Sequence, residues 1–318
     1  MNAHKLHLLA FKFLQSRKTK TSGFKNYDAS FPYSKYNDTL KSIFNSDDDL
    51  LFEKLILADK KQMEVYIQRY CDYLSLNGYK IKNIKSLKEE NKNNDIFENL
   101  FALYNYYPSF SAKWNNKIVD VVDTRTCLYC NREYIINYTD KTETKTTAEL
   151  DHYYPRSLYP FLSISFFNLI PSCKTCNSKL KGDKDTFVEE ILYPYQESLN
   201  NNANFKLKIF DTDFLHNKGS FDLNLDVKNK KANESIKLFK LEELYTEHKD
   251  IVLELIQKAE IYNDSYIDEL FNRYEGTLFK NREDLMRLIT CGYITDEEIN
   301  KRPLSKLIKD ISEELGLV

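Results

Sequence analysis

The sequence predicts an α+β protein that is mostly helical. Three observations lead to this prediction: helical periodicity in the first part of the chain, short β-leaning runs in the middle, and alternating runs followed by further helical stretches. A chain of 318 residues is long enough for one large domain or two to three small ones. We therefore expect three consecutive regions, which span residues 1–120, 121–185 and 186–318.

The first region reads as helices with polar interruptions. In MEVYIQRYCDYLSLNGY, apolar residues such as Ile67, Tyr70 and Leu74 recur three or four positions apart, which is typical of an amphipathic helix ending near Gly78. IFENLFALYNYYP predicts a second helix that stops before Pro108. The charged stretch KEENKNNDI shows no periodicity and predicts a loop.

The middle region changes character and the last one returns to helix. REYIINYT and TTAELDHYY are β-leaning runs, and NFKLKIF and SFDLNLDVK alternate around a turn with Gly219, which predicts a β-hairpin. ESIKLFKLEELYTEHKDIVLELIQKAEIY then predicts one long helix or two, with DSYIDELFNRY and REDLMRLIT as further helices. Pro303 fits the first turn of a last helix. This region either completes the core or binds a partner or substrate.

Composition and charge exclude several classes of protein. No apolar run approaches the roughly 20 residues that cross a bilayer, and the first residues lack the pattern of a signal peptide. We expect a cytoplasmic protein without membrane contact. Six of the first 26 residues are basic and none is acidic, whereas residues 186–318 carry 18 Lys and Arg against 26 Asp and Glu. The basic segment either follows phosphates or is a solvated terminus, and the chain does not resemble a strongly basic nucleic-acid binder.

Four of the six cysteines form two C-x-x-C pairs, Cys127 with Cys130 and Cys173 with Cys176. In a protein with reduced thiols, such pairs bind metal or do redox work more often than they form structural disulfides. Four thiolates complete a closed tetrahedral zinc site. The alternatives are coincidental spacing and a redox dithiol, although nothing near either pair predicts a thioredoxin-type unit. A closed zinc site has no open position, so any chemistry must come from other residues.

The segment between and after these pairs supplies such residues: Asp151 next to His152, then Asn168, then Asn177 directly after Cys176. The order D-H, N and C-x-x-C-N, with an earlier C-x-x-C, resembles the HNH (ββα-metal) endonuclease family over about residues 125–185, a fifth of the chain. The surrounding runs CLYCNREY, LDHYYPRS and YPFLSISFFNLIPSCKTCNSKLKGDK are most similar to HNH proteins of bacterial anti-phage systems. In Septu-type and related retron systems, such a nuclease accompanies an ABC- or AAA-type ATPase.

The resemblance implies a local fold. Asp151 and His152 would end the first strand of a hairpin, Asn168 would lie near the start of the second strand, and a helix from about Lys174 would carry Asn177. Adjacent residues of a strand point to opposite faces. The resemblance therefore also implies that the strand end twists enough for Asp151 and His152 to serve one site.

The resemblance further implies a role for each residue. His152 would be the general base that takes a proton from the attacking water, which suits a group that titrates near neutrality. Asp151 and Asn177 would hold one Mg²⁺ or Mn²⁺ through oxygen ligands, although many family members have histidine at the position of Asn177. Asn168 would position the loop that bears the histidine. Three cations are candidate phosphate contacts or solvated surface charges: Arg156, Lys179 and Lys181.

The predicted function is that of a metal-dependent endonuclease with a structural zinc, with DNA favoured over RNA, including tRNA, as its target. The resemblance implies that it acts as an effector of anti-phage defence together with an ATPase partner. The alternative is a non-catalytic, zinc-stabilised module that binds nucleic acid or protein and whose polar residues only satisfy the hairpin. His216 and His248 lack ligand-spaced partners, and Cys71 and Cys291 are expected to be buried small hydrophobes.

Overall fold

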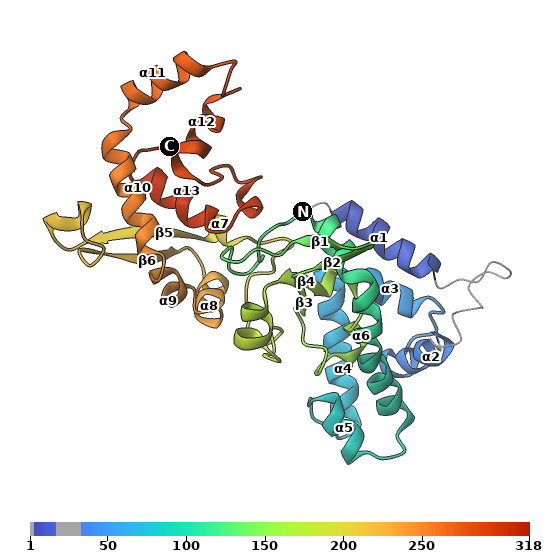
Figure 1. Ribbon diagram of the computed structural model, residues 1–318. Helices are drawn as coiled ribbons and strands as arrows, with labels where there is room; N and C mark the ends of the chain where they lie inside the picture. The colour runs from blue at the N-terminus through green and yellow to red at the C-terminus, as the bar shows by residue number, and fades with distance from the viewer. Residues whose placement is uncertain (1–2, 17–32) are drawn as a thin grey trace. The chain divides into compact units, whose positions relative to one another are not determined.

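The computed structural model describes residues 3–16 and 33–318 and shows a mixed α+β protein, as the sequence predicts (Figure 1). The predicted basic segment falls partly on Arg17, Lys18, Lys20 and Lys25, which lie outside the described residues. None of the described helices is both long and apolar enough to cross a bilayer.

The chain folds into two compact units, and each unit combines segments that are separate in the sequence. Unit 1 contains the chain up to residue 123 together with 137–171 and 181–190, and unit 2 contains 124–136, 172–180 and 191–318. The predicted middle region, 121–185, thus contributes to both units. Its cysteine-bearing segments fold with the C-terminal part of the chain, and its strands fold with the N-terminal helices.

The described part of unit 1 begins with these helices (Figure 1): α1 Ala3–Ser16, α2 Tyr33–Phe44, α3 Leu51–Leu57, α4 Lys60–Leu76, α5 Ile84–Glu90 and α6 Asp95–Val122. The periodic run that predicted a helix ending near Gly78 is α4, which buries Ile67, Tyr70 and Leu74. The chain leaves α4 at Gly78, whose φ of +77° belongs to the left-handed region that favours glycine. The predicted loop KEENKNNDI is wrong at both ends, because its first three residues end α5 and its last two begin α6.

The second predicted helix does not stop before Pro108. Helix α6 runs from Asp95 to Val122 with Pro108 inside it. Proline has no N–H, so the carbonyl of Tyr104, four residues earlier, loses its helical partner. A guanidinium N–H of Arg156 donates to that carbonyl at 2.9 Å instead. The helix continues because a side chain far along the chain replaces the missing donor.

The strands of unit 1 lie against α6. They form two two-stranded sheets, one of β1 Asn137–Asp140 with β2 Glu143–Thr146 and one of β3 Glu149–His152 with β4 Leu169–Ser172. The chain between β3 and β4 contains two short 3-10 turns, η2 Pro160–Leu162 and η3 Phe166–Asn168. From α6, the amide of Asn115 donates to the carbonyl of Ala148 at 3.0 Å, and the amide of Asn116 donates to that of Thr144 at 2.8 Å. These bonds fix the strands on the helix.

An aromatic cluster forms much of the core of unit 1. Phe13 of α1 packs edge-on against Phe110 and Trp114 of α6, with ring centroids 5.2 and 5.3 Å apart. Phe166 of η3 meets Phe110 edge-on at 5.6 Å. Edge-to-face geometry is favourable beyond the burial of area. The cluster therefore ties the segment before β4 to two helices, and these aromatic rings serve packing.

Unit 2 contains the predicted hairpin and a set of helices. Its elements are η4 Thr175–Lys181, whose last residue belongs to unit 1, then α7 Leu199–Asn202, β5 Ala203–Ile209, η5 Thr212–Leu215, β6 Phe221–Val227, α8 Lys230–Leu238, α9 Leu241–Thr246, α10 Lys249–Ile261, α11 Asp264–Tyr274, α12 Arg282–Thr290, η6 Ile299–Lys301 and α13 Ser305–Glu314. Strands β5 and β6 are antiparallel, with Phe205 opposite Leu225, so the hairpin is confirmed. The long helical run, expected as one helix or two, forms α8, α9 and α10; Lys240, with a left-handed φ of 51°, separates α8 from α9, and Glu247 and His248 separate α9 from α10. Pro303 lies just before α13 and not in its first turn.

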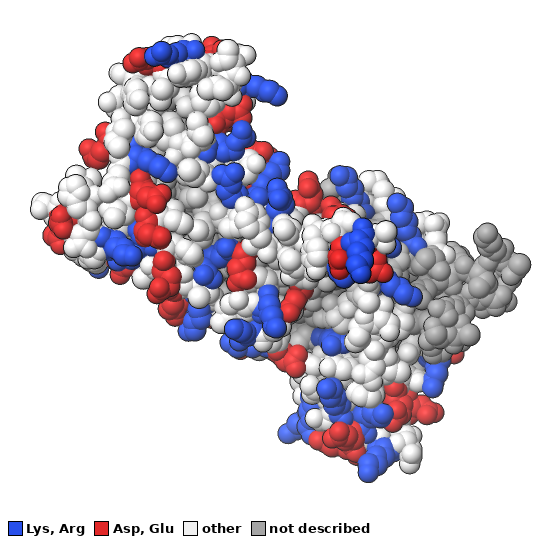
Figure 2. Space-filling model, in the orientation of Figure 1, with Lys and Arg blue, Asp and Glu red and all other residues white. Residues whose placement is uncertain are grey.

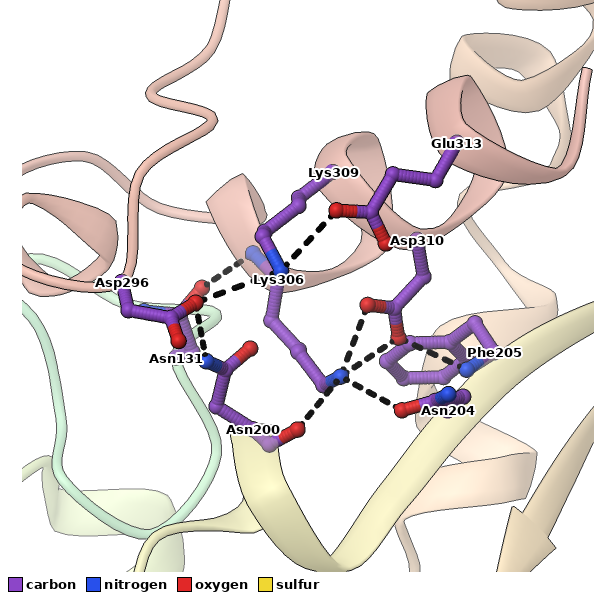
Figure 3. A network of polar contacts seen from close by, with 9 residues as sticks. All are labelled: Asn131, Asn200, Asn204, Phe205, Asp296, Lys306, Lys309, Asp310 and Glu313. Carbon is purple, nitrogen blue, oxygen red and sulfur yellow. Dashed lines mark hydrogen bonds and ion pairs between the residues drawn. The ribbon is translucent and has the colours of Figure 1, made fainter. Parts of the chain in front are cut away.

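A buried lysine joins α13 to the hairpin of unit 2 (Figure 3). The ammonium of Lys306, whose side chain is 3 % exposed, pairs with Asp310 at 2.7 Å and also donates to Asn200 and Asn204. Asp310 in turn accepts from the backbone N–H of Phe205 on β5 at 2.8 Å. Because a buried charge costs free energy unless it is paired and hydrogen-bonded, this network makes Lys306 compatible with the interior.

Candidate functional site

The four cysteines of the two pairs come together in unit 2. Their sulfur atoms all lie within 4.8 Å of one another, and all four residues are buried. The Sγ atoms of Cys130 and Cys173 are 4.0 Å apart, and all four thiols are free of disulfides. In a tetrahedron with Zn–S bonds of about 2.3 Å, two sulfurs lie about 3.8 Å apart. The cluster therefore has the size and ligand type of a structural zinc site.

Backbone donors orient the sulfur atoms. The N–H of Arg132 points at Sγ of Cys130 and that of Cys176 at Sγ of Cys173, both at 3.4 Å. The first loop closes on itself, because Asn131 donates its N–H to the carbonyl of Cys127 at 2.9 Å and takes a φ of 51°. Such outer contacts hold metal ligands in place.

The cluster disfavours ionisation of the Cys176 thiol. Hydrogen bonds with the neighbouring thiols, that of Cys127 foremost, together with burial, raise the pKa of Cys176. The Cys176 thiol therefore favours its protonated form unless a cation is present, and a zinc ion supplies the positive charge that stabilises a thiolate. This is the donor set of a metal centre rather than of an exposed, reactive dithiol.

Side chains that the sequence did not single out support the cysteine loop. The hydroxyl of Tyr245 on α9 donates to the carbonyl of Cys130 at 2.6 Å. The side chain of Asn131 donates to the carbonyl of Ile299 and accepts the backbone N–H of Lys306. His248, predicted to lack ligand-spaced partners, bonds the Arg132 guanidinium through Nε2 at 3.1 Å. These contacts tie the cysteine loop to the C-terminal helices, and their sequence separations of more than 100 residues hide them from local patterns.

In unit 1, Asp151 and His152 end β3, and Asn168 directly precedes β4, as the resemblance implies. His152 is buried, and its Nε2 lies 2.9 Å from the carbonyl oxygen of Ser163. A carbonyl only accepts, so Nε2 carries the proton and Nδ1 keeps a lone pair. Burial, with a smaller effect of Arg156, lowers the pKa of His152 to about 3 and keeps the ring neutral.

Tyr107 packs against the ring of His152, and Arg156 packs on Tyr107. Tyr107 of α6 packs edge-on against it at 4.3 Å between centroids, and the Tyr107 hydroxyl donates to the carbonyl of Leu150 at 3.1 Å. The guanidinium of Arg156 lies over the Tyr107 ring at 4.7 Å and over that of Tyr104 at 4.3 Å. Arg156, a predicted phosphate contact, thus packs on α6, the helix whose carbonyl at Tyr104 it also satisfies. Its predicted contact with phosphate stays a prediction.

Lys181 is buried, whereas a solvated surface charge would be exposed. Its side chain is 0 % exposed, and its ammonium lies 3.1 Å from Oδ1 of Asp151, which is itself 2 % exposed. The same ammonium donates to the carbonyl of His152 at 2.6 Å. The Asp151 carboxylate therefore already holds a cation, and its oxygen chemistry suits the hard ions Mg²⁺ and Mn²⁺. The predicted contact of Lys181 with phosphate stays a prediction.

Asn168 is fully buried and makes the bonds of a residue that fixes a loop. Its Oδ1 accepts the N–H of Tyr154 at 2.8 Å, and its Nδ2 donates to the carbonyls of Tyr154 at 3.0 Å and Leu162 at 3.2 Å. Its backbone carbonyl accepts the N–H of Tyr153. The segment directly after His152 is thereby held to the start of β4.

The remaining predicted residues lie in unit 2. Asn177 stands on η4, is half-buried, and donates its N–H to the carbonyl of Cys173 at 3.0 Å. Lys179 is exposed on the same helix. The helix was expected from about Lys174, and it is a π-helix over Thr175–Lys181, a wider winding that is frequent at functional sites. The pairing of Asn177 with Asp151 in one metal site stays a prediction.

One cavity was not expected from the sequence. It has a volume of about 770 Å³ in unit 2, beside α12, and three cations line it: Lys280, Arg287 and Arg302. The exposed thiol of Cys291 lines it too, which makes the prediction of a buried Cys291 wrong, and Cys71 is only half-buried. Of the residues singled out in the sequence, Cys291 lines this cavity, whereas the predicted site residues do not, and the scattered spacing of its cations gives no motif.

Comparison with known proteins gives one partial relationship. The chain is 35 % identical over 75 residues to the Septu protein PtuB of Bacillus thuringiensis. The match covers 24 % of this chain and 26 % of that protein, so the similarity spans about a quarter of each. No family model matches the chain, and no solved structure matches it.

Proposed function

We propose that this chain is a metal-dependent HNH endonuclease that hydrolyses phosphodiester bonds, on DNA ahead of RNA. The observation that carries the proposal is the state of His152: a neutral ring, fixed in one tautomer, next to a carboxylate at the end of a strand. A neutral imidazole with a free lone-pair position on Nδ1 is what a general base requires. The two C-x-x-C pairs that flank this segment in the sequence are part of the same resemblance to HNH proteins and also support the proposal.

In the proposed reaction, Nδ1 of His152 takes a proton from the water that attacks phosphorus. The hydrogen bond from Nε2 to Ser163 and the Tyr107 ring keep the imidazole in one orientation. Burial weakens the base in the substrate-free protein, but the negative charge of a phosphodiester beside the ring favours the imidazolium form. The base therefore gains strength when substrate is in place.

Asp151 and Asn177 are the proposed holders of one Mg²⁺ or Mn²⁺. The fit rests on Asp151, whose buried carboxylate already pairs with a cation in the form of the Lys181 ammonium. Such an ion supplies charge that polarises the phosphate and stabilises the leaving oxygen. The proposed role of Asn168 is indirect, since it fixes the backbone that follows His152. Arg156, Lys179 and Lys181 remain candidate contacts to phosphate.

We further propose that the protein is an effector of anti-phage defence that works with an ATPase partner in the cytoplasm. The relationship to a protein named Septu protein PtuB supports the defence role. The proposed ATPase partner follows from the resemblance to Septu-type systems. On the face shown in Figure 2, basic and acidic side chains of the described residues are interspersed.

The proposal is tested by cleavage assays on double-stranded DNA, single-stranded DNA and tRNA in Mg²⁺ and Mn²⁺, with and without the proposed ATPase partner. We expect His152→Ala to abolish cleavage. His216→Ala is the matched control, because His216 is exposed and is not one of the residues of the proposed site. Cleavage by His152→Ala at the wild-type rate would refute the proposed chemistry.

The alternative is a zinc-stabilised binding module without catalysis. It is favoured by the fact that Asp151, His152 and Asn168 all have hydrogen-bond partners inside unit 1. It predicts normal defence against phage for His152→Ala and Asp151→Ala, but loss of defence for Cys173→Ser. The endonuclease proposal predicts loss of defence for all three variants, so a plaque assay separates the two.

A further inference from the structure

Lys181 is a buried cation that bonds two consecutive residues of the proposed site. Its ammonium reaches Oδ1 of Asp151 at 3.1 Å and the backbone oxygen of His152 at 2.6 Å. The side chains of both Lys181 and Asp151 are essentially inaccessible to water. A lysine placed at the end of η4 therefore crosses to the end of β3, and all three groups belong to unit 1.

Burial makes this pair interdependent. A charge removed from water is costly unless an opposite charge and further hydrogen bonds compensate for it. The carboxylate of Asp151 has the ammonium as its cationic neighbour, and the carbonyl of His152 uses another of the ammonium protons. Removal of the lysine alone would leave a buried carboxylate without this partner, whereas removal of both charges would leave none.

We propose that Lys181 is a positioning residue that holds the Asp151–His152 end of β3 and lowers the affinity of Asp151 for a divalent cation. The inference rests on the proposed function, in which Asp151 is a metal ligand. An ammonium and a divalent cation that share one carboxylate repel each other. The lysine thus keeps the strand end ordered without a metal ion and makes metal binding weaker and more reversible.

The first test is a double-mutant cycle on the zinc-loaded full chain, read as the thermal unfolding midpoint. We expect Lys181→Met to lower the midpoint by about 10 °C, as breaking a buried pair does. Asp151→Asn should also lower it, and the double variant should lose clearly less than the sum of the two. Lys184→Met is the matched control, since Lys184 is exposed three residues later, and should leave the midpoint unchanged.

Additive losses in this cycle would overturn the inference. If Lys181→Met fails to fold, recovery of folding in the double variant supports the pair, and failure of the double variant as well overturns it. The midpoint does not depend on cleavage, so this test stands apart from the activity of the protein.

The second test measures Mn²⁺ binding by electron paramagnetic resonance of the free ion. We expect Lys181→Met to bind Mn²⁺ on the order of tenfold more tightly than the wild type, because a repelling charge is gone. Asp151→Asn should remove this binding. Equal or weaker binding by Lys181→Met would overturn the inference, because a lysine with a purely structural role would not restrain the metal.

The two proposals fail separately. Cleavage that survives His152→Ala would remove the nuclease but leave the thermal coupling of Lys181 and Asp151 in place. Loss of cleavage in His152→Ala combined with unchanged Mn²⁺ affinity in Lys181→Met would leave the nuclease and remove the role assigned to Lys181.

Discussion

At the scale of single residues, burial decides what the polar groups of the site do. His152 is neutral because it lies in the interior, and its tautomer follows from a single carbonyl acceptor at Ser163. Asp151 stays in the interior because a lysine from another element accompanies it. A motif specifies the residue types, but these neighbours set their protonation and orientation.

Asn168 provides a prediction at this scale. Asn168→Ala removes three side-chain hydrogen bonds and leaves the backbone N–H and carbonyl of Tyr154 without these partners in the interior. We expect a loss of about 2–4 kcal/mol in the free energy of unfolding, measured by urea denaturation of the zinc-loaded protein. Asn224→Ala, at an exposed position on β6, is the control. Equal losses in both variants would contradict the loop-fixing role of Asn168.

The sequence predicted the residue types of the site better than their contacts. The cysteine pairs were found by spacing alone, because two C-x-x-C pairs are a local pattern with a defined geometric meaning. Arg156 and Lys181 were expected at phosphates or at the surface, since basic residues are mostly exposed. Their actual partners, Tyr104 and Asp151, lie 52 and 30 positions away, and a single sequence does not encode such pairings in a local pattern.

At the scale of elements, helix α6 connects an apparent defect to the candidate site. Pro108 removes one helical hydrogen bond, Arg156 satisfies the carbonyl that is left, and the same guanidinium lies over Tyr107, which packs on His152. The sequence predicted a helix that stops before Pro108, because proline lacks the N–H that the interior of a helix uses. A tertiary contact reverses that outcome here.

This arrangement predicts a coupling between Pro108 and Arg156. Arg156→Met should lower the free energy of unfolding by about 1–3 kcal/mol, because the carbonyl of Tyr104 loses its donor. In a Pro108→Ala background the alanine N–H supplies a donor to the same carbonyl, so the added cost of Arg156→Met should be smaller. Urea denaturation of the four proteins measures the difference. An equal cost of Arg156→Met in both backgrounds would show that Arg156 does not replace the missing helical bond.

The hairpin of unit 2 could be predicted from the sequence, but the boundaries of the helices after it could not. The hairpin of β5 and β6 was predicted because alternation is a local signal with a period of two. The helical run after it was expected as one helix or two but forms α8, α9 and α10, because its periodicity persists across the breaks at Lys240 and at His248. Periodicity identifies a helical face and does not mark every interruption.

At the scale of the whole molecule, two compact units share the segment that carries the motif. The four cysteines belong to unit 2, and Asp151, His152 and Asn168 belong to unit 1. The sequence predicted three consecutive regions because composition changes along the chain. Folding joins segments by contact rather than by order, so the middle region divides between the units.

The cysteine cluster makes a prediction for the whole protein. Purified protein should contain about one zinc ion per chain, measured by inductively coupled plasma mass spectrometry. Cys173→Ser should lose the zinc and lower the thermal unfolding midpoint, because a structural zinc contributes directly to folding. Cys291→Ser, which changes an exposed thiol outside the cluster, should keep both. Wild-type protein without zinc would contradict the metal-centre interpretation of the cluster.

The central claim is that the end of β3 performs phosphodiester hydrolysis. Its most direct measurement is cleavage of plasmid DNA and of tRNA in Mg²⁺ by wild-type protein, His152→Ala and His216→Ala, each zinc-loaded and each supplied with the proposed ATPase partner. We predict cleavage by the wild type and by His216→Ala, with a loss of at least about a hundredfold in His152→Ala, the size of a general-base contribution. Equal cleavage by all three proteins, or cleavage by none of them on DNA and tRNA alike, would contradict the account.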